Sequence, residues 1–443
     1  MPMRLLFSSI FAALTMAVIS GPAAAQIGLP GGLPQRPALP GGLPSRLPVD
    51  PDALTRAGRE GLERGFQAPA RLSGLIRQSG GALEADPDGW PAVRGEVVAV
   101  DLSAEGRRRA LAAGFTVVRE ERLAALDMTT AVLAPPRGLS LRRAVERLRD
   151  LDPEGSYAFN HVHAPAGALA EAGGAAGAVS APQGGRGRMG LIDTGVDEQH
   201  PAVAGAHVVQ RGFAGPARAA PHGTAVASLM VGRAGAFEGA APGGALYAAD
   251  VYGGSPTGGS STGLAQALAW MAENDVPVVN VSLVGPRNAV VEAAVRRASG
   301  RGMLIVAAVG NDGPSAPPLY PAAYADVVGV TAVNGRGRVL PESGRGPQVD
   351  FAAPGADMAA AGPGQGYVNV RGSSFAAPLV AGLLAQRLQQ PDPNGAEAAL
   401  TGVTRTATDA GARGPDPVYG RGVVAADLRV EPRAVGARGQ LRE

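Results

Sequence analysis

The chain of 443 residues contains no cysteine and no lysine. Without cysteine it cannot form disulfides, thiolate zinc sites or a thiol nucleophile. The absence of lysine excludes a serine–lysine dyad and Schiff-base chemistry, and arginine alone gives the sequence its pI near 9.2. The net charge is only +2, so bulk electrostatics do not predict binding to nucleic acid or to a membrane surface.

Long apolar stretches are also scarce, and the one that stands out lies near the N-terminus. Residues 5–19 are largely apolar, follow Arg4 and precede the small residues Gly21-Pro22-Ala23-Ala24-Ala25. The stretch is too short to span a bilayer and has the flanks of a secretory signal. We therefore expect a signal peptide over residues 1–25, a periplasmic or secreted protein, and no membrane span after signal removal. A retained N-terminal anchor is the alternative.

Residues 26–94 are rich in proline and glycine. The octet at residues 29–36 recurs almost unchanged at residues 39–46. Such octets cannot build a core, and they favour a flexible, partly polyproline-like tether. The sequence therefore predicts a spacer over residues 26–94, with weak helix at most over residues 52–77.

Residues 95–163 predict a small separate domain. The expected strands are 97–100, 115–118, 128–133 and 156–160, and the expected helices run over 103–113 and from 140. This β-α-β-β-α-β order is the split βαβ arrangement. His161 and His163 follow on the closing strand and face the same side. Two ligands without a third make a poor metal site, so both are expected to be surface histidines.

A Gly/Ala-rich connection over residues 164–187 leads into the main domain, residues 188–430. A short Arg-rich tail follows over residues 431–443, and we expect it to be solvated. In the main domain, continuous apolar strands alternate with amphipathic helices. This alternation predicts a three-layer α/β fold with a parallel sheet between helices. In such folds the functional groups gather outside the carboxyl ends of the strands.

Four polar residues fall at the ends of apolar segments. Ser374 and His222 each lie in the first turn of an apolar helix, while Asp193 and Asn311 follow apolar strands at glycine turns. Taken alone, each has an ordinary explanation as a helix cap or a turn residue. A serine nucleophile, however, needs a base, an orienting acid and oxyanion donors. Together the four residues predict an acyl-transfer site at one rim of the sheet.

Three motifs carry a resemblance to a known family: Leu-Ile-Asp-Thr-Gly-Val at 191–196, His-Gly-Thr-Ala-Val-Ala at 222–227 and Gly-Ser-Ser-Phe-Ala-Ala-Pro at 372–378. With them, the region from Met189 to Asp427 resembles the subtilisin-like serine endopeptidases (subtilases, peptidase family S8), as does the chain order Asp, His, Ser. The resemblance implies that Ser374 is the nucleophile, His222 the general base and then acid, and Asp193 the group that fixes the imidazole tautomer. The Asn311 side chain and the Ser374 backbone N–H would form the oxyanion hole.

The resemblance also gives residues 95–163 a role. Many members of this family carry an N-terminal βαββαβ prodomain, which assists folding and inhibits the enzyme until it is cleaved. Residues 156–163 would then lie in the active cleft, and cleavage would fall near His163–Ala164. A permanently attached domain is the alternative.

The same resemblance implies a substrate cleft. Its walls would come from Ser282, Leu283, Val284, Gly285, Ala307 and Ala308. Because Val284 stands where many members have glycine, we hypothesise a narrowed pocket and a preference for small or slender side chains at the cleavage position.

The remaining expectations concern cofactors and binding partners. Catalysis would need no cofactor, and structural calcium stays open because no family calcium loop is recognisable. We expect a monomer that acts on polypeptides, with its own prodomain as an intramolecular inhibitor. The alternative to an active enzyme is a binding or chaperone module that has a protease fold but no catalytic activity.

Overall fold

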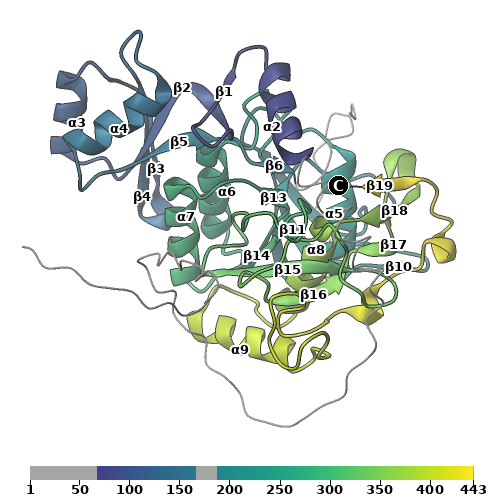
Figure 1. The fold of residues 1–443 in the computed structure, drawn as a ribbon. Helices are drawn as coiled ribbons and strands as arrows, with labels where there is room; N and C mark the ends of the chain where they lie inside the picture. Colours follow the sequence, from purple (N-terminus) through teal and green to yellow (C-terminus); the bar gives the residue numbers. More distant parts are fainter. Residues whose placement is uncertain (1–66, 166–186, 443) are drawn as a thin grey trace, which may run out of the picture. The chain divides into compact units, whose positions relative to one another are not determined.

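The computed structural model describes residues 67–165 and 187–442. The predicted signal peptide, most of the predicted spacer and nearly all of the predicted connection therefore lie outside the described residues. No helix within these two ranges is long and apolar enough to cross a membrane. Figure 1 shows the chain coloured from the N-terminus to the C-terminus.

A parallel sheet of seven strands forms the centre of the larger part of the structure. The order across the sheet is β16-β15-β14-β12-β7-β11-β8, and every neighbouring pair is parallel. The strands are β7 (Arg188–Asp193), β8 (His207–Gly212), β11 (Ala245–Asp250), β12 (Val278–Val281), β14 (Leu304–Ala308), β15 (Val327–Val333) and β16 (Phe351–Pro354). Most of their residues are small or β-branched and buried, which suits a sheet covered on both faces. The predicted parallel sheet is confirmed.

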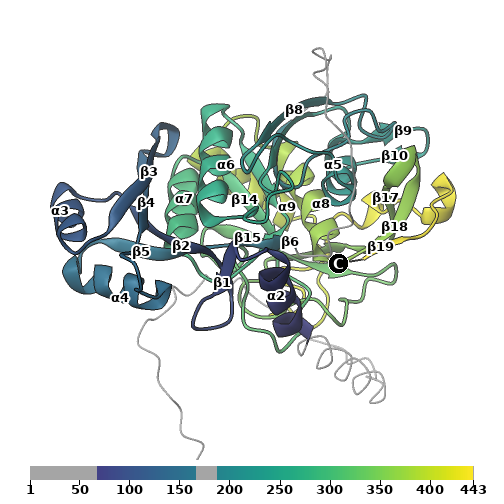
Figure 2. The ribbon, with the colours of Figure 1, turned by 90° about the horizontal axis from the view of Figure 1, so that it is seen from above.

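Helices cover both faces of this sheet. Successive residues of β7 illustrate the two sides, because Leu191 packs in one apolar cluster and Ile192 in the other. The Leu191 cluster holds α5 (Pro221–Val231), α8 (Ser373–Ala385) and α9 (Pro393–Thr404), and the Ile192 cluster holds α6 (Ser261–Glu273) and α7 (Ala289–Gly300). Figure 2 shows α6 and α7 side by side and apart from α5 and α8. This is the expected three-layer architecture.

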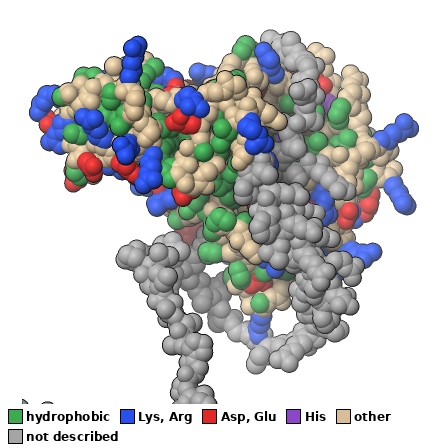
Figure 3. Space-filling model, turned by 45° about the horizontal axis from the view of Figure 1, so that its top comes forward, with side chains coloured by type: hydrophobic (Ala, Val, Ile, Leu, Met, Phe, Trp, Pro, Cys, Tyr) green, Lys and Arg blue, Asp and Glu red, His purple; other side chains and the backbone are tan. Residues whose placement is uncertain are grey.

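The smaller part has the predicted β-α-β-β-α-β order. Its elements are β2 (Pro91–Val100), α3 (Ala104–Ala112), β3 (Thr116–Leu123), β4 (Met128–Ala134), α4 (Leu141–Leu151) and β5 (Ser156–His161). One face of the sheet, with Val97 and Leu133, packs against Val145 and Leu148 of α4. The other face, which includes Val98, belongs to the cluster formed with α6 and α7. On the face seen in Figure 3, basic and acidic side chains are interspersed.

Residues 67–94 differ from the expected flexible spacer. They form α2 (Gln67–Gln78), β1 (Leu83–Ala85) and the start of β2. Leu75 and Ile76 of α2 pack on a small cluster of Leu83, Val93 and Val162, and Arg71 forms an ion pair with Asp312 at 3.1 Å. The position of α2 agrees with the weak helix expected up to residue 77, but the prediction of a flexible spacer was wrong here, because the proline-rich octets dominate the composition of residues 26–94. The apolar side chains that order α2 are few.

The end of the chain also differs from expectation. The predicted solvated tail contributes β19 (Gln440–Arg442), which pairs in parallel with β18 (Tyr367–Arg371), and β18 pairs with β17 (Ala356–Ala361). An edge strand has unpaired backbone groups that a passing segment can bind, and composition does not reveal such pairing. The shorter elements include a two-stranded sheet of β9 (Arg233–Ala234) and β10 (Phe237–Glu238). They also include the 3-10 helices η1 (Ala124–Leu126), η2 (Pro363–Gln365), η3 (Ala426–Leu428) and η4 (Pro432–Val435).

His161 and His163 are buried, which contradicts the prediction of surface histidines. His161 Nε2 lies 3.0 Å from Asp86 Oδ2, and its Nδ1 lies 3.0 Å from Asn288 Nδ2. His163 is fully buried, and neither of its ring nitrogens has a hydrogen-bond partner within the described part of the chain. Burial lowers the pKa of His163 to about 3, and the nearby His161 acts in the same direction. The strand pattern did not reveal that both sides of this segment are covered.

Candidate active site

The four predicted chemical residues lie at the ends of elements that meet on the carboxyl side of the sheet. Asp193 is the last residue of β7, and Asn311 follows the end of β14 by three residues. His222 and Ser374 are the second residues of α5 and α8. The two helices pack against each other and on the same face of the sheet.

Asp193 and His222 form a direct pair. His222 Nδ1 lies 2.9 Å from each carboxylate oxygen of Asp193, and both side chains are almost completely buried. The Thr194 backbone N–H donates to Asp193 Oδ1 at 2.6 Å, which fixes the carboxylate. With Nδ1 donating to Asp193, the other ring nitrogen of His222 has the character of a base.

A glycine allows this pair to form. Gly223 lies directly after His222, and its N–H donates to Thr194 Oγ1 at 2.9 Å. A Cβ at Gly223 would lie 2.3 Å from the Thr194 carbonyl oxygen, closer than side-chain atoms tolerate. The start of α5 therefore reaches the end of β7 only because residue 223 has no side chain.

Ser374 lies at the start of α8, the end of the helix that packs on His222. The ring of the next residue, Phe375, packs on the His222 ring with centroids 5.4 Å apart, and Ser374 itself is buried. Gly372 precedes the helix with φ of 145°, a conformation that favours glycine. The N-terminal end of α8 directs backbone N–H groups and partial positive charge toward this place.

Asn311 is tied to the same helix start. Its Oδ1 accepts a hydrogen bond from the Ser373 backbone N–H at 3.1 Å. In return, Ser373 Oγ accepts from the N–H of Gly310 at 3.2 Å. These two bonds hold the Asn311 carboxamide next to Ser374, with its oxygen turned to the helix and its nitrogen as the donor end.

The predicted cleft residues divide into two sets. Ser282 donates through Oγ to the Ser374 carbonyl oxygen at 3.5 Å, and β13 (Leu283–Val284) pairs antiparallel with β6 (Ala164–Pro165). Ala308 packs on the α5–α8 side of the sheet, whereas Ala307 packs on the α6–α7 side, away from Ser374. The structure therefore brings the 282–285 segment to the site but not the Ala307 side chain.

Sequence reasoning missed the residues that hold the strand beside β13. Tyr252 donates through its hydroxyl to the His163 carbonyl oxygen at 2.9 Å, and the His163 N–H donates to the Gly259 carbonyl oxygen at 2.8 Å. Residues 162–165 thus lie between the 259–260 segment and β13. A tyrosine after a strand carries no motif that would have marked Tyr252.

A metal site is not evident at this place. Within residues 67–165 and 187–442, no three His, Cys, Asp or Glu side chains are grouped so that they could hold a metal ion. Carbonyl-rich calcium sites need fewer carboxylates, so structural calcium stays an open expectation.

Comparison with known proteins supplies the context. Residues 188–422, just over half of the chain, match the subtilase family. Subtilisin Savinase from Lederbergia lenta is 36% identical over 210 residues, which cover 46% of this chain and 76% of that protein. An alkaline protease from Alkalihalobacillus alcalophilus is also 36% identical over 210 residues, but the match spans only 54% of its length. In fold, the chain is similar to fervidolysin from Fervidobacterium pennivorans, described as a keratinolytic enzyme related to subtilisin. That match has a TM-score of 0.62 at 20% identity and covers 76% of this chain and 61% of fervidolysin.

Proposed function

The chain belongs to the subtilase family of serine endopeptidases, and on this premise we propose that Ser374, His222 and Asp193 are its catalytic triad. The observation that carries the proposal is the buried pair of His222 and Asp193, with Nδ1 at 2.9 Å from both carboxylate oxygens. This pair lies against the first turn of α8, where Ser374 is located.

The chemistry follows from this geometry. His222 Nε2 takes the proton of Ser374 Oγ as that oxygen attacks the carbonyl carbon of the substrate, and a tetrahedral oxyanion forms. His222 then donates the proton to the leaving amine, which leaves an acyl-enzyme. A water molecule attacks the acyl group by the same steps, releases the carboxylic acid and restores Ser374. Asp193 keeps the imidazole in the required tautomer and stabilises its protonated form.

The oxyanion requires donors that are in place before it forms. In this proposal the donors are the Asn311 side-chain nitrogen and the Ser374 backbone N–H. Support comes from the bond between Asn311 Oδ1 and the Ser373 N–H, which fixes the carboxamide at the helix start. Donors that are already oriented need no reorganisation when charge develops.

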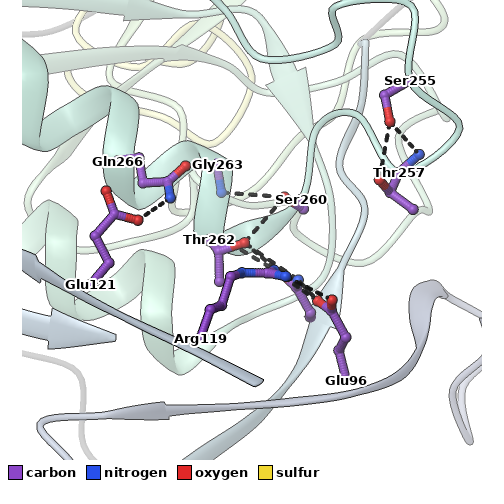
Figure 4. Close-up of polar contacts among 10 residues, drawn as sticks. Glu96, Arg119, Glu121, Ser255, Thr257, Ser260, Thr262, Gly263 and Gln266 are labelled. Carbon is purple, nitrogen blue, oxygen red and sulfur yellow. Dashed lines mark hydrogen bonds and ion pairs between the residues drawn. The ribbon is translucent and has the colours of Figure 1, made fainter. Parts of the chain in front are cut away.

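We propose further that the small domain is an inhibitory prodomain. Two contacts support this role: β6, which follows the domain, occupies the strand position beside β13, and the domain docks on the start of α6. There, Asn160 accepts from the Thr262 N–H at 3.2 Å and donates to Glu96 at 2.7 Å. Figure 4 shows Glu96 and Thr262 at this contact, together with the pair of Glu121 and Gln266.

The processing site is proposed to lie beyond Pro165, C-terminal to the predicted His163–Ala164 bond. The His163 carbonyl oxygen is bonded to the Tyr252 hydroxyl, and Ala164 and Pro165 pair with Val284 and Leu283. A strand in this register has not yet reached Ser374. N-terminal sequencing of the mature protein, which should begin after Pro165, tests this proposal. A start at Ala164 would contradict the processing site.

Substitution of Ser374 by alanine tests the proposed function. The variant should remain unprocessed and should not hydrolyse casein. It is then treated with a trace of wild-type enzyme, so that loss of activity cannot be attributed to the retained prodomain. Casein hydrolysis above that of the added trace would contradict the assignment of Ser374 and favour a different nucleophile. A silent binding module predicts that the wild-type protein itself is inactive.

A further inference from the structure

Two apolar side chains meet at the residue that precedes Asn311. A Cβ built on Gly310 would lie 2.6 Å from Leu319 Cδ1 and 3.5 Å from Val284 Cγ1. Leu319 and Val284 are both buried, at 4% and 2% exposure. The space beside the backbone of Gly310 is therefore bounded by a leucine and a valine, next to the proposed oxyanion donor.

Leu319 is held there by its neighbour. The Tyr320 N–H donates to the Gly285 carbonyl oxygen at 3.0 Å, and the Gly285 N–H donates to the Tyr320 carbonyl oxygen at 2.9 Å. This reciprocal pair attaches the 319–320 segment to the residue that follows β13. These backbone hydrogen bonds hold the segment that carries Leu319 in place beside β13.

The strand β6 shows how a peptide aligns with β13. Ala164 pairs with Val284 and Pro165 with Leu283, so a peptide in this register brings its next residue opposite Ser282. Ser282 contacts the Ser374 carbonyl oxygen. The residue opposite Ser282 is therefore the one whose carbonyl comes nearest to the proposed nucleophile.

The alternation of side chains gives the direction in which that residue points. Leu283 packs with the α6–α7 cluster, whereas Val284 packs with the α5–α8 cluster that also contains Leu319. In an antiparallel pair, opposite residues share a face, and residues two apart on a strand also share a face. The substrate residue opposite Ser282 consequently directs its side chain to the face of Val284, toward Leu319 and Gly310.

We propose that Leu319, with Val284, closes the pocket for the side chain immediately before the cleaved bond and restricts the substrates to those with glycine, alanine or serine there. The proposal rests on the proposed function and names its substrate class. A hydrophobic pocket lowers kcat/KM by about 10- to 200-fold for a substrate with one methylene that does not fit. A buried leucine such as Leu319 cannot move aside for a larger side chain without straining the residues packed around it.

The experiment compares two peptides that differ only in alanine or phenylalanine before the cleaved bond. Processed wild-type enzyme should have a kcat/KM at least about 10-fold higher for the alanine peptide. Leu319→Ala should raise the phenylalanine-to-alanine ratio by about 10- to 200-fold, and the double variant with Val284→Gly should raise it further. Leu388→Ala is the matched control, because Leu388 is an equally buried leucine beyond the far end of α8, and it should leave the ratio unchanged.

The outcomes separate the two proposals. An unchanged ratio in an active Leu319→Ala enzyme, or equal cleavage of both peptides by wild type, would overturn the role of Leu319 and leave the proposed function intact. Absence of cleavage of either peptide by wild type and by all variants would overturn both. If Leu319→Ala does not accumulate as folded protein, Leu319→Val removes a single methylene and should still shift the ratio in the same direction.

Discussion

At the scale of single residues, the amide of Asn311 makes the most quantitative prediction. Asn311→Ala should lower kcat by about 10²- to 10³-fold, the range established for subtilisin itself, because one donor to the oxyanion is lost. The KM should change little, since the donor acts mainly on the transition state. Steady-state kinetics on a short peptide measure both constants.

Asn334 supplies the control for this substitution. Its Oδ1 accepts a hydrogen bond from the Arg336 N–H at 3.0 Å in an exposed turn. Asn334→Ala therefore removes the same carboxamide group as Asn311→Ala, but at a position away from the active site. An equal loss of kcat in the two variants, or a loss below about 10-fold in Asn311→Ala, would contradict the role of Asn311.

Residues at the ends of apolar segments could be predicted from the sequence, whereas contacts between distant segments could not. Asp193 and His222 were predictable because each follows or begins an apolar segment, and the carboxyl edge of a parallel sheet brings such ends together. The contact between Leu319 and Gly310 was not predictable, because it depends on the reciprocal backbone hydrogen bonds between Tyr320 and Gly285. A contact between segments that are distant in sequence leaves no local pattern.

At the scale of elements, the docking of α5 on the end of β7 depends on Gly223. Gly223→Ala would place a methyl group 2.3 Å from the Thr194 carbonyl oxygen. The helix start must then shift, and His222 moves with it relative to Asp193. We expect kcat/KM to fall by about 10²-fold, since misplacement of about 1 Å has this effect.

Gly300, at the end of α7, is the matched control for Gly223. A Cβ there meets nothing within 4 Å, and alanine favours helix more than glycine does. Gly300→Ala should therefore leave kcat/KM unchanged and should not lower the unfolding temperature. Wild-type kinetics in Gly223→Ala would show that α5 does not need the close approach.

The elements themselves were predictable where apolar periodicity was strong. The parallel strands and the β-α-β-β-α-β order followed from such patterns. By contrast, the sequence predicts only weak helix where α2 forms, and it gives no sign of β19. The reason is that α2 is ordered by a small cluster around Val162 and β19 by the edge of β18. Both depend on partners elsewhere in the chain, and their own composition suggests a spacer and a tail.

At the scale of the whole molecule, His163 links stability to pH. Its pKa is about 3 in the folded protein, because burial disfavours the charged form, and about 6.5 in an unfolded chain. The unfolded state therefore binds a proton as pH falls below about 6.5 while the folded state does not, and stability is lost over that range. Between pH 7.5 and 5.5 the loss due to this group is about 1.4 kcal/mol.

Denaturant unfolding measures this linkage. In a Ser374→Ala background, which prevents self-digestion, His163→Leu should reduce the loss of unfolding free energy between pH 7.5 and 5.5 by about 1.4 kcal/mol. His207→Asn, on the edge strand β8, removes a histidine elsewhere and should not reproduce that change. An identical pH dependence with and without His163 would contradict its burial in a neutral form.

Ser374 is proposed to be the nucleophile of a triad with His222 and Asp193. The most direct measurement is covalent labelling of the processed enzyme with a fluorophosphonate, followed by mass spectrometry of the labelled peptide. One adduct is expected, on Ser374, and proteolysis should fall in proportion to the labelling. Proteolysis that continues without an adduct, or an adduct on another serine that accounts for the inactivation, would contradict this proposal.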